Sequence, residues 1–248
     1  MSKSRLDLLL VSRGLVATRE RARAIILAGD VSVDGRPVTK AGTAVDEGAV
    51  VRLRQADHPW VGRGGLKLDH GLTAFAIDVT GRRALDIGAS TGGFTDVLLA
   101  RGAAHVVAVD VGENQLDWRL RTDPRVLCLE RVNARYLTPA ALPEGYRTFD
   151  IVTIDVSFIS LKHILPVVPP LLAPEGRVIA LVKPQFEAGR ADVGAGGVVR
   201  DPDVHARVVD QVTADAHRVG LVRLGVEPSP ITGAEGNREF LMLLAHHD

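Results

Sequence analysis

Apolar and polar residues along the first fifty positions follow two different periods. Apolar side chains first recur at helical spacing and then alternate with polar ones as in strands. These patterns predict two helices and a small sheet, over residues 5–12, 19–28, 31–38 and 50–53. Thr18 can cap the second helix and Gly29 can end it, while Asp34-Gly35 is typical of a hairpin turn. Together these elements predict a small α+β module.

From Lys67 onward, strand-like apolar runs alternate with amphipathic helical segments. The predicted strands cover residues 84–88, 105–111, 126–130, 151–157, 177–183, 221–226 and 239–244. The predicted helices cover residues 66–76, 94–101, 115–121, 161–172 and 204–219, of which 161–172 contains three prolines. This alternation predicts an α/β fold with a Rossmann-like, doubly wound sheet that is mostly parallel and has its last strand antiparallel.

A short glycine-rich stretch separates the two regions. Residues 58–65 contain His58-Pro59 and three glycines, with Trp60 as a candidate to dock against either region. We therefore expect a first domain over residues 1–57, a linker over 58–65 and a second domain over 66–248.

The formal net charge of zero conceals an asymmetry between the regions. Residues 1–55 carry ten Lys and Arg against six Asp and Glu, whereas the remainder carries twenty against twenty-four. A basic segment on a neutral chain favours contact with an anion such as a phosphate backbone, although a solvated basic surface would give the same count. Aromatic residues make up 4% of the chain, which argues against single-strand binding by rows of stacked rings.

Cys128 is the single cysteine, so no internal disulfide is possible, and its apolar neighbours predict a core position. No apolar run approaches the roughly 18 residues that span a bilayer. The N-terminus lacks the pattern of a signal peptide. We expect a cytoplasmic protein with no membrane partner and no bound metal.

A strand, a glycine-rich turn and a helix follow one another at the start of the predicted sheet. The segment Ala84–Phe94 reads Ala-Leu-Asp-Ile-Gly-Ala-Ser-Thr-Gly-Gly-Phe. Glycines let a ligand approach the backbone, and the helix start offers free N–H groups. Asp86 precedes the first glycine, where it would repel a pyrophosphate but attract the ammonium or sulfonium group of S-adenosylmethionine. The spacing also differs from the G-x-G-x-x-G pattern of folds that bind NAD.

A second carboxylate, Asp110, ends the next strand, 24 residues after Asp86. This is the usual position of a residue that binds a ribose diol. Asn133, which follows the third strand, is assigned to the same site. The residues predicted to bind S-adenosylmethionine are Asp86, Gly88, Ala89, Ser90, Thr91, Gly92, Gly93, Asp110 and Asn133.

Four ionisable residues are predicted to meet where the parallel strands end, which is where open sheets bind ligands. Asp155 and Lys183 end two apolar strands, and Glu239 opens the final strand. An antiparallel final strand brings its beginning to this same edge. Lys67 lies on the helix before the first strand and can enter from the side. Each of the four, taken alone, could also be a surface charge.

Two lysines and two acids suit the methylation of a ribose hydroxyl, which is a poor nucleophile and must lose its proton. A lysine acts as a base when burial and a second cation favour its neutral form. We assign that task to Lys183, with Asp155 orienting it. Lys67 would favour the neutral amine and hold the hydroxyl oxygen, while Glu239 anchors the lysines. Much of the rate would come from positioning.

Four blocks of the sequence are long enough to be specific, namely Leu85–Thr95, Asp155–Leu161, Leu181–Glu187 and Gly233–Asn237. They resemble the TlyA family of rRNA 2′-O-methyltransferases, and the resemblance covers nearly the whole chain. The second domain is similar to the FtsJ ribose methyltransferases. Their Lys-Asp-Lys-Glu tetrad corresponds here to Lys67, Asp155, Lys183 and Glu239. The resemblance implies methylation of a cytidine ribose in ribosomal RNA.

The first domain resembles the S4 RNA-binding domain, which also occurs on pseudouridine synthases. The residues expected to contact RNA phosphates are Arg5, Arg19, Arg23 and Lys40. Arg19 and Arg23 are four residues apart and share a helix face. Contacts of this kind position an enzyme on RNA without reading its sequence.

Two features depart from the family pattern. Ser90 stands where many methyltransferases have a glycine, although this family tolerates serine there. The sequence ends at Asp248, directly after the last strand, without the C-terminal helix of longer members. By resemblance to shorter members, this implies a preference for large-subunit rRNA.

Three other interpretations compete with this one. An RNA base methyltransferase would need an Asn-Pro-Pro-Tyr-like loop or a catalytic cysteine, and here Ser157-Phe158-Ile159 follows the fourth strand instead. A membrane-active haemolysin, a name this family sometimes carries, would need a long apolar or amphipathic segment. A binding-only protein would have lost the tetrad, which is intact.

Overall fold

The chain divides after Pro59 in the computed structural model, which describes residues 2–16, 18–27, 29–53, 58–233 and 235–247. The first unit is Met1–Pro59 and the second is Trp60–Asp248. Trp60 and Val61, which the sequence assigns to a linker, pack against a core of the second unit. Position 65 must be glycine, because a methyl group there would lie 2.4 Å from Trp60 Cγ.

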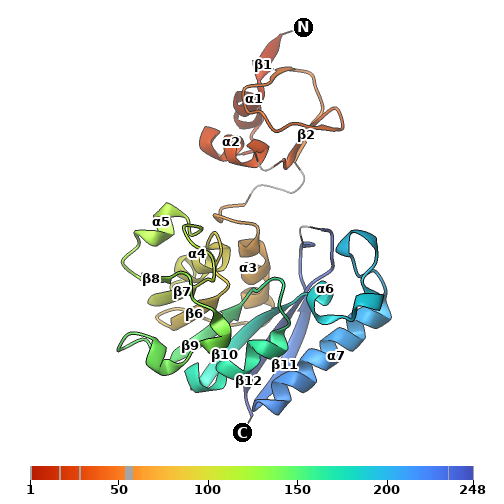
Figure 1. Ribbon diagram of the computed structural model, residues 1–248. Helices are drawn as coiled ribbons and strands as arrows, with labels where there is room; N and C mark the ends of the chain where they lie inside the picture. The colour runs from red at the N-terminus through yellow and green to blue at the C-terminus, as the bar shows by residue number, and fades with distance from the viewer. Residues whose placement is uncertain (1, 17, 28, 54–57, 234, 248) are drawn as a thin grey trace. The chain divides into compact units, whose positions relative to one another are not determined.

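The described residues of the first unit form two helices and two small sheets, several of which are labelled in Figure 1. Its elements are, in chain order, β1 (Lys3–Arg5), α1 (Leu6–Ser12), α2 (Arg19–Leu27), β2 (Val31–Val33), β3 (Arg36–Pro37), β4 (Ala44–Asp46) and β5 (Val51–Leu53). Strand β1 pairs with β4, and β2 lies between β3 and β5. The sequence does not predict β1 and β4, which are three residues long and form a separate two-stranded sheet.

The start and end of α2 and the turn between β2 and β3 lie where the sequence predicts them. Thr18 Oγ1 accepts a hydrogen bond from the Arg21 N–H at 3.1 Å, so the predicted cap is confirmed. Gly29 follows α2 with a φ of +77°, the left-handed conformation in which helices commonly end. Asp34 and Gly35 also have positive φ, as a tight hairpin turn requires.

The second unit is an α/β fold built on one large sheet. Its strands are β6 (Arg83–Ile87), β7 (His105–Val109), β8 (Val126–Leu129), β9 (Phe149–Ile154), β10 (Leu172–Val182), β11 (Leu221–Pro228) and β12 (Phe240–His246). Its α-helices are α3 (Gly64–Ala74), α4 (Gly93–Ala100), α5 (Trp118–Arg121), α6 (Pro184–Glu187) and α7 (Pro202–Arg218). Its 3₁₀ turns are Ala134–Tyr136, Pro139–Ala141, Leu161–His163, Leu165–Val167, Pro169–Leu171, Arg190–Asp192 and Ala195–Gly197.

The strand order is β11-β12-β10-β9-β6-β7-β8. Strand β12 is antiparallel to both β10 and β11, whereas β10, β9, β6, β7 and β8 run parallel. The predicted doubly wound sheet with an antiparallel last strand is therefore confirmed. From β6 the chain proceeds to β7 and β8 on one side and then returns to β9 on the other. This reversal places a ligand-binding crevice beyond the ends of β6 and β9.

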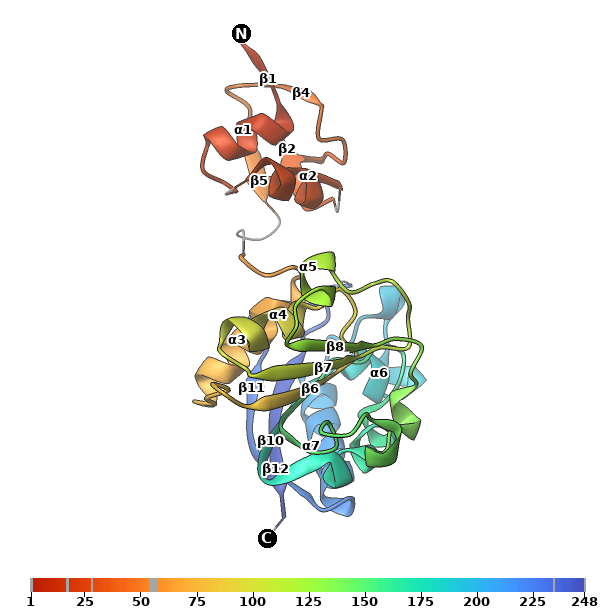
Figure 2. The same cartoon turned by 90° about the vertical axis from the view of Figure 1, so that its left-hand side faces the viewer.

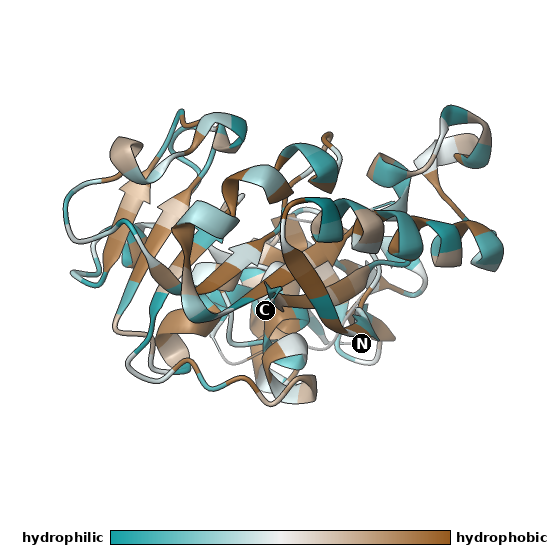
Figure 3. Ribbon diagram, turned by 90° about the horizontal axis from the view of Figure 1, so that it is seen from below, coloured by the Kyte–Doolittle hydropathy of each residue, from teal (hydrophilic) through white to brown (hydrophobic). Residues whose placement is uncertain are grey.

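Side chains of the central strands alternate between two hydrophobic cores, because successive strand residues point to opposite faces. Leu85 and Ile87 belong to the core that α7 covers, and Ala84 belongs to the core that α3 and α4 cover. Figure 2 shows helices on both faces of the sheet. Figure 3 shows mainly hydrophobic residues along the strands and a mixture of hydrophobic and hydrophilic residues along the helices.

The proline-bearing segment differs from the prediction. The sequence predicts one helix over residues 161–172, but the structure has three separate 3₁₀ turns there. Proline lacks the N–H that continues an α-helix, and three prolines interrupt this stretch. Strand β10 then begins at Leu172, earlier than predicted, with an irregular register between Leu172 and Arg177.

Cys128 lies on β8, half-buried against the core that contains α3 and α4, as its apolar neighbours predict. Burial raises the pKa of its thiol. Across the described ranges, no helix is both long enough and apolar enough to span a bilayer.

Candidate active site

The carboxyl ends of β6 and β9 meet at the switch point of the sheet. The Asp155 N–H donates to the carbonyl oxygen of Ile87 at 2.9 Å, so the chain leaving each strand stays beside the other. Gly88 follows with a φ of +86°, and a methyl group on it would lie 2.3 Å from the carbonyl oxygen of Asp155. Glycine is therefore required at the first position of the turn.

Asp110 holds the glycine turn from the neighbouring strand. Its Oδ2 accepts from the Ser90 N–H at 2.8 Å, and its Oδ1 accepts from the Gly112 N–H at 2.7 Å. Ser90 has a φ of +49°, a conformation in which glycine is more common. The carboxylate has lone pairs beyond these two bonds, so it can still accept from a hydroxyl group of a ligand.

A pocket of about 540 Å³ lies beyond β6, β7 and β9. Its lining includes the predicted residues Gly88, Ser90, Asp110, Asn133 and Asp155. A smaller pocket of about 180 Å³ is lined by the predicted residues Gly88, Ala89, Ser90, Thr91, Gly93, Asp155 and Lys183. Gly92 lines neither pocket; it begins α4 with a φ of +97°, and a methyl group there would lie 2.3 Å from Leu120 Cδ1. Its role is in the turn itself.

Asp86 lies inside the protein and lines neither pocket, and its contact with the cofactor stays a prediction. Its side chain has no exposed surface. Thr95 Oγ1 donates to Asp86 Oδ2 at 2.7 Å, and Thr153 Oγ1 donates to Asp86 Oδ1 at 2.9 Å. The carboxylate thus joins β6 to α4 and β9 under the glycine turn, and it supports the turn from within.

The buried carboxylate of Asp86 should make stability depend on pH. Burial raises its pKa to about 6, although the bonds from the two threonines act in the opposite direction. The unfolded chain titrates lower, so between about pH 4 and 6 the folded state binds more protons, and stability falls as pH rises through this window. Asp86→Asn should therefore raise the free energy of unfolding near neutral pH by roughly 2–3 kcal/mol.

This gain should shrink as the pH is lowered towards about 5, since the wild-type carboxyl is then increasingly neutral. Urea unfolding followed by tryptophan fluorescence would measure it, because both tryptophans, Trp60 and Trp118, belong to the second unit. A gain of the same size at both pH values would contradict the assignment of the effect to ionisation.

The four predicted catalytic residues form two ion pairs. Lys183 Nζ lies 2.5 Å from Asp155 Oδ1 and donates to Ser157 Oγ at 2.9 Å. Lys67 Nζ, from α3, lies 2.6 Å from Glu239 Oε2. Both lysines are buried, and Glu239 is 3% exposed. Each lysine is therefore held in place by an acid from a strand end.

The sheet register brings these two pairs to one edge. Val182 lies opposite Phe240 in the antiparallel pairing of β10 with β12. Lys183 and Glu239 are the next residues outward on these strands, so they emerge side by side. Asp155 emerges from β9, the other neighbour of β10. Lys183 with Asp155 and Lys67 with Glu239 thus form two ion pairs at this edge of the sheet, and their joint action as a tetrad stays a prediction.

Two further residues after β9 belong to the site, and the sequence patterns did not identify them. Ser157 contacts Lys183 and lines both pockets. Phe158 lines the larger pocket, is 90% exposed and has a φ of +63°, which is rare for a bulky side chain. Its ring centroid lies 5.2 Å from that of Phe186. Ser157 and Phe158 follow Asp155 by two and three residues, and this closeness in the sequence is the signal that could have identified them.

Glu187 ties the loop after β9 to the helix that follows Lys183. Its Oε2 accepts from Ser160 Oγ at 2.6 Å, and its Oε1 accepts from the Leu161 N–H at 2.7 Å. Burial raises the pKa of this carboxyl. The two bonds fix the loop that carries Ser157 relative to the segment that carries Lys183.

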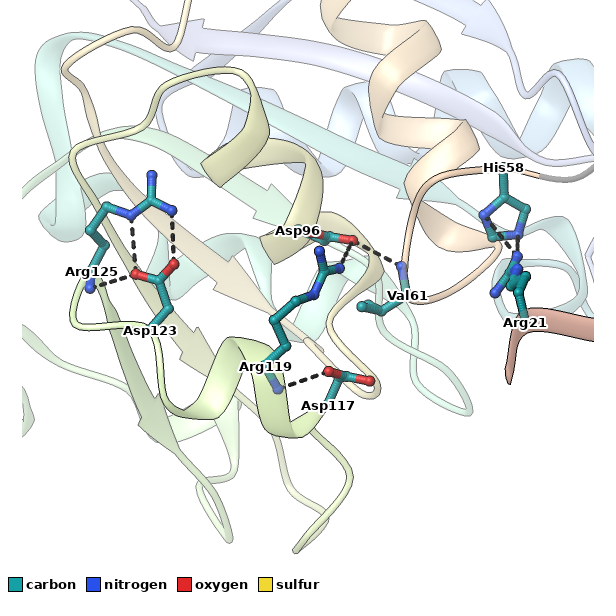
Figure 4. Close-up of polar contacts among 8 residues, drawn as sticks. All are labelled: Arg21, His58, Val61, Asp96, Asp117, Arg119, Asp123 and Arg125. Atoms are coloured by element: carbon teal, nitrogen blue, oxygen red, sulfur yellow. Dashed lines mark hydrogen bonds and ion pairs between the residues drawn. The ribbon is translucent and has the colours of Figure 1, made fainter. Parts of the chain in front are cut away.

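The chain that enters the second unit is held against the glycine turn. Asp96 Oδ2, on α4, accepts from the Val61 N–H and from Arg119 Nη2, both at 2.9 Å (Figure 4). A methyl group on Gly62 would lie 2.8 Å from Thr91 Oγ1, a residue of the smaller pocket. Residues 60–65 therefore pack directly on one wall of the site.

The predicted phosphate contacts all lie in the first unit. Arg5 and Arg19 each form an ion pair with Asp7, which is completely buried. Arg23 lies one turn after Arg19 on α2, and it is exposed, as is Lys40. Cationic groups at these positions are available to an anionic partner.

The larger pocket suits S-adenosylmethionine. Gly88 lets a ligand reach the backbone, and Asp110 can accept from a ribose diol. Val109, Val132 and Ile164 add apolar walls of the kind that an adenine ring contacts. The polar and apolar parts of the lining thus match those of the cofactor.

Comparison with known proteins agrees with this geometry. Residues 60–246 match the FtsJ-like methyltransferase family, and residues 4–51 match the S4 domain. The "16S/23S rRNA (cytidine-2'-O)-methyltransferase TlyA" of Mycobacterium tuberculosis is 51% identical over 243 residues, which cover 98% of this chain and 90% of that protein. The chain belongs to the TlyA family.

Two other proteins are similar to this chain over nearly its whole length. "Putative rRNA methyltransferase YqxC" of Bacillus subtilis is 49% identical, over 98% of this chain and 85% of its own. The solved structure of "Putative hemolysin from Streptococcus thermophilus" is 46% identical with a TM-score of 0.78, covering 100% of this chain and 90% of that one. TlyA membership confirms the predicted methyltransferase, its S-adenosylmethionine cofactor and its RNA-binding domain.

Proposed function

We propose that this protein methylates the 2′-hydroxyl of a cytidine ribose in ribosomal RNA, with large-subunit RNA as the preferred substrate. The observation that carries the proposal is the ion pair of the buried Lys183 with the partly exposed Asp155, which lies on the wall of the smaller pocket beside the glycine turn. A lysine in this position can take a proton from a hydroxyl group brought to the pocket.

S-Adenosylmethionine, when bound, supplies an electrophilic methyl group. Lys183, in its neutral amine form, accepts the proton that the ribose hydroxyl loses as it attacks. Asp155 then stabilises the resulting ammonium group, and Ser157 helps to fix the direction of Nζ. Glu239 holds Lys67 at the same edge of the sheet, where the positive charge of Lys67 would stabilise the negative charge that develops on the hydroxyl oxygen.

The first unit provides the contact with RNA. We assign phosphate contacts to Arg5, Arg19, Arg23 and Lys40, which belong to the basic part of the chain. Such contacts supply affinity and orientation, while the second unit supplies the chemistry. The M. tuberculosis relative is named for both 16S and 23S rRNA, so separate subunits are the substrates to compare.

The test is to incubate the purified protein with labelled S-adenosylmethionine and separated ribosomal subunits. We expect label in the large subunit. Its position should map to a cytidine by reverse transcription at low dNTP concentration, because a 2′-O-methyl group then stops the reverse transcriptase. Label on a base would contradict ribose methylation, and label confined to the small subunit would contradict the preference. Dye leakage from liposomes without any methylation would favour the membrane-active interpretation.

A further inference from the structure

A buried acid lies between two of the arginines assigned to RNA. Asp7, in the first turn of α1, has no exposed surface. Its Oδ1 accepts from Arg5 Nε at 3.0 Å, and its Oδ2 accepts from Arg5 Nη2 at 3.0 Å. Arg19 Nε donates to the same Oδ2 at 3.0 Å, and the Leu8 N–H donates to Oδ1 at 3.1 Å. One carboxylate therefore holds guanidinium groups from two separate elements.

The two arginines keep part of their donors for another partner. Each is bound to Asp7 through its Nε side, yet the Arg5 side chain is 45% exposed and the Arg19 side chain 51%. A guanidinium is a planar fork with five N–H donors, so the Nη1 group of Arg5 and both Nη groups of Arg19 lie outside these bonds. Because both arginines share one oxygen of Asp7, their donors are gathered in one place.

Backbone hydrogen bonds join the start of α1 to the segment that follows Lys40. The Asp7 N–H donates to the Ala41 carbonyl oxygen at 3.1 Å, and the Leu6 N–H donates to that of Thr43 at 2.9 Å. These bonds hold the segment that begins with the exposed Lys40 against the start of α1. Lys40, whose side chain is exposed, thus directly precedes a segment that is bound to the start of α1.

Asp7 carries a negative charge inside a cluster that is assigned to bind phosphate. The hydrogen bonds from Arg5 and Arg19 hold its pKa well below the usual range of a carboxyl, although burial acts against them. The group is thus an anion at neutral pH, and by Coulomb's law alone it weakens the attraction of this cluster for a phosphate. If the cluster binds RNA, the fixed orientation that Asp7 gives to the two arginines must contribute more to phosphate binding than its negative charge takes away.

We propose that Asp7 is a positioning residue that presents Arg5 and Arg19 as one preorganised receptor for a backbone phosphate of RNA. The long arginine side chains lose rotamer freedom in the free protein, so less is lost when the phosphate binds. Phosphate oxygens then accept from the outward Nη groups in the fork geometry that suits arginine. This inference rests on the proposed RNA-binding function of the first unit.

Asp7→Asn gives opposite results under the two interpretations. The substitution adds one positive charge, so a purely Coulombic role predicts tighter binding to RNA. Preorganisation predicts binding that is about tenfold weaker. The slope of log Kd against log salt concentration should also be smaller, by roughly 0.7–0.9 for each phosphate that the variant no longer neutralises. The probe is large-subunit ribosomal RNA transcribed in vitro, titrated with the full-length protein at several salt concentrations. Equal or tighter binding by the variant would overturn the proposal.

Because Asp7 is buried, a variant that keeps it is needed in case Asp7→Asn unfolds the first unit. Arg19→Lys preserves the charge at an exposed position, but an ammonium group cannot bind Asp7 and a phosphate through separate edges of a planar fork. We expect it to weaken RNA binding about as much as Arg19→Ala. Arg36→Lys, the same change at an exposed residue of β3, is the matched control and should bind like wild type. Equal affinities of Arg19→Lys and Arg36→Lys would overturn the proposal.

The wild-type protein separates this inference from the proposed function. If wild type neither binds nor methylates ribosomal RNA, both fail together. If wild type methylates the RNA while Asp7→Asn folds and binds it undiminished, the positioning role alone fails.

Discussion

Replacing Lys183 with alanine should lower kcat for methyl transfer by about 10²–10⁴-fold, the usual contribution of a general base. The physical reason is that Lys183 Nζ is held by Asp155 and Ser157 on the pocket wall, where a ribose hydroxyl must lose its proton. Affinity for the cofactor should change little, because the larger pocket does not include this side chain. Single-turnover labelling of ribosomal RNA would measure the rate, and calorimetry with S-adenosylhomocysteine would measure the affinity.

Lys162→Ala is a suitable control for that experiment. Lys162 is an exposed lysine of the second unit, on the 3₁₀ turn that follows the loop after β9. Its removal changes the net charge by the same amount, and we expect nearly wild-type kcat. A Lys183→Ala protein that kept activity within tenfold of wild type would exclude the lysine as the base.

Replacing Glu239 with alanine should destabilise the second unit by about 3–5 kcal/mol, the usual cost of leaving one member of a buried ion pair uncompensated. Lys67 Nζ lies 2.6 Å from Glu239 Oε2, and the two side chains are 10% and 2% exposed. Urea unfolding followed by the fluorescence of Trp60 and Trp118 would measure the change. A loss below about 1 kcal/mol would show that the pair is compensated in another way.

The double variant Lys67→Met with Glu239→Leu separates stability from catalysis at this pair. Apolar residues of similar volume often replace a buried ion pair without loss of stability, so the double variant should unfold close to wild type. Its methyl-transfer rate should still be low, because neither side chain can act on Lys183 or on the hydroxyl oxygen. A double variant that was both stable and active would remove Lys67 and Glu239 from the catalytic group.

Much of the fold follows from the sequence because its local patterns are strong. The strands of the large sheet overlap the apolar runs that predict them, although β10 begins earlier, at Leu172. The cap at Thr18 and the turn at Asp34-Gly35 are local hydrogen-bonding and φ requirements. The tetrad could also be predicted, since the ends of parallel strands and the start of an antiparallel one share an edge. Strand direction and the residue at each strand end suffice for that prediction.

Other features depend on contacts between distant segments. Strands β1 and β4 are three residues long and exist because they pair with each other across some forty residues. Asp86 has the residue type and spacing of a cofactor ligand, yet its side chain points into the protein, where Thr95 and Thr153 hold it. Local sequence patterns predict neither the pairing of β1 with β4 nor the direction of the Asp86 side chain.

The sequence by itself determined the order of strands and helices, the glycine turn and the four ionisable residues at the strand ends, because each depends on periodicity or on neighbouring residues. Only the tertiary structure decided that Arg5 and Arg19 share Asp7, and that Glu239 pairs with Lys67 in particular. The reason is that a charged side chain in water has no fixed partner. A buried charge needs one, and only the packing of the chain determines which opposite charge lies close enough to pair with it.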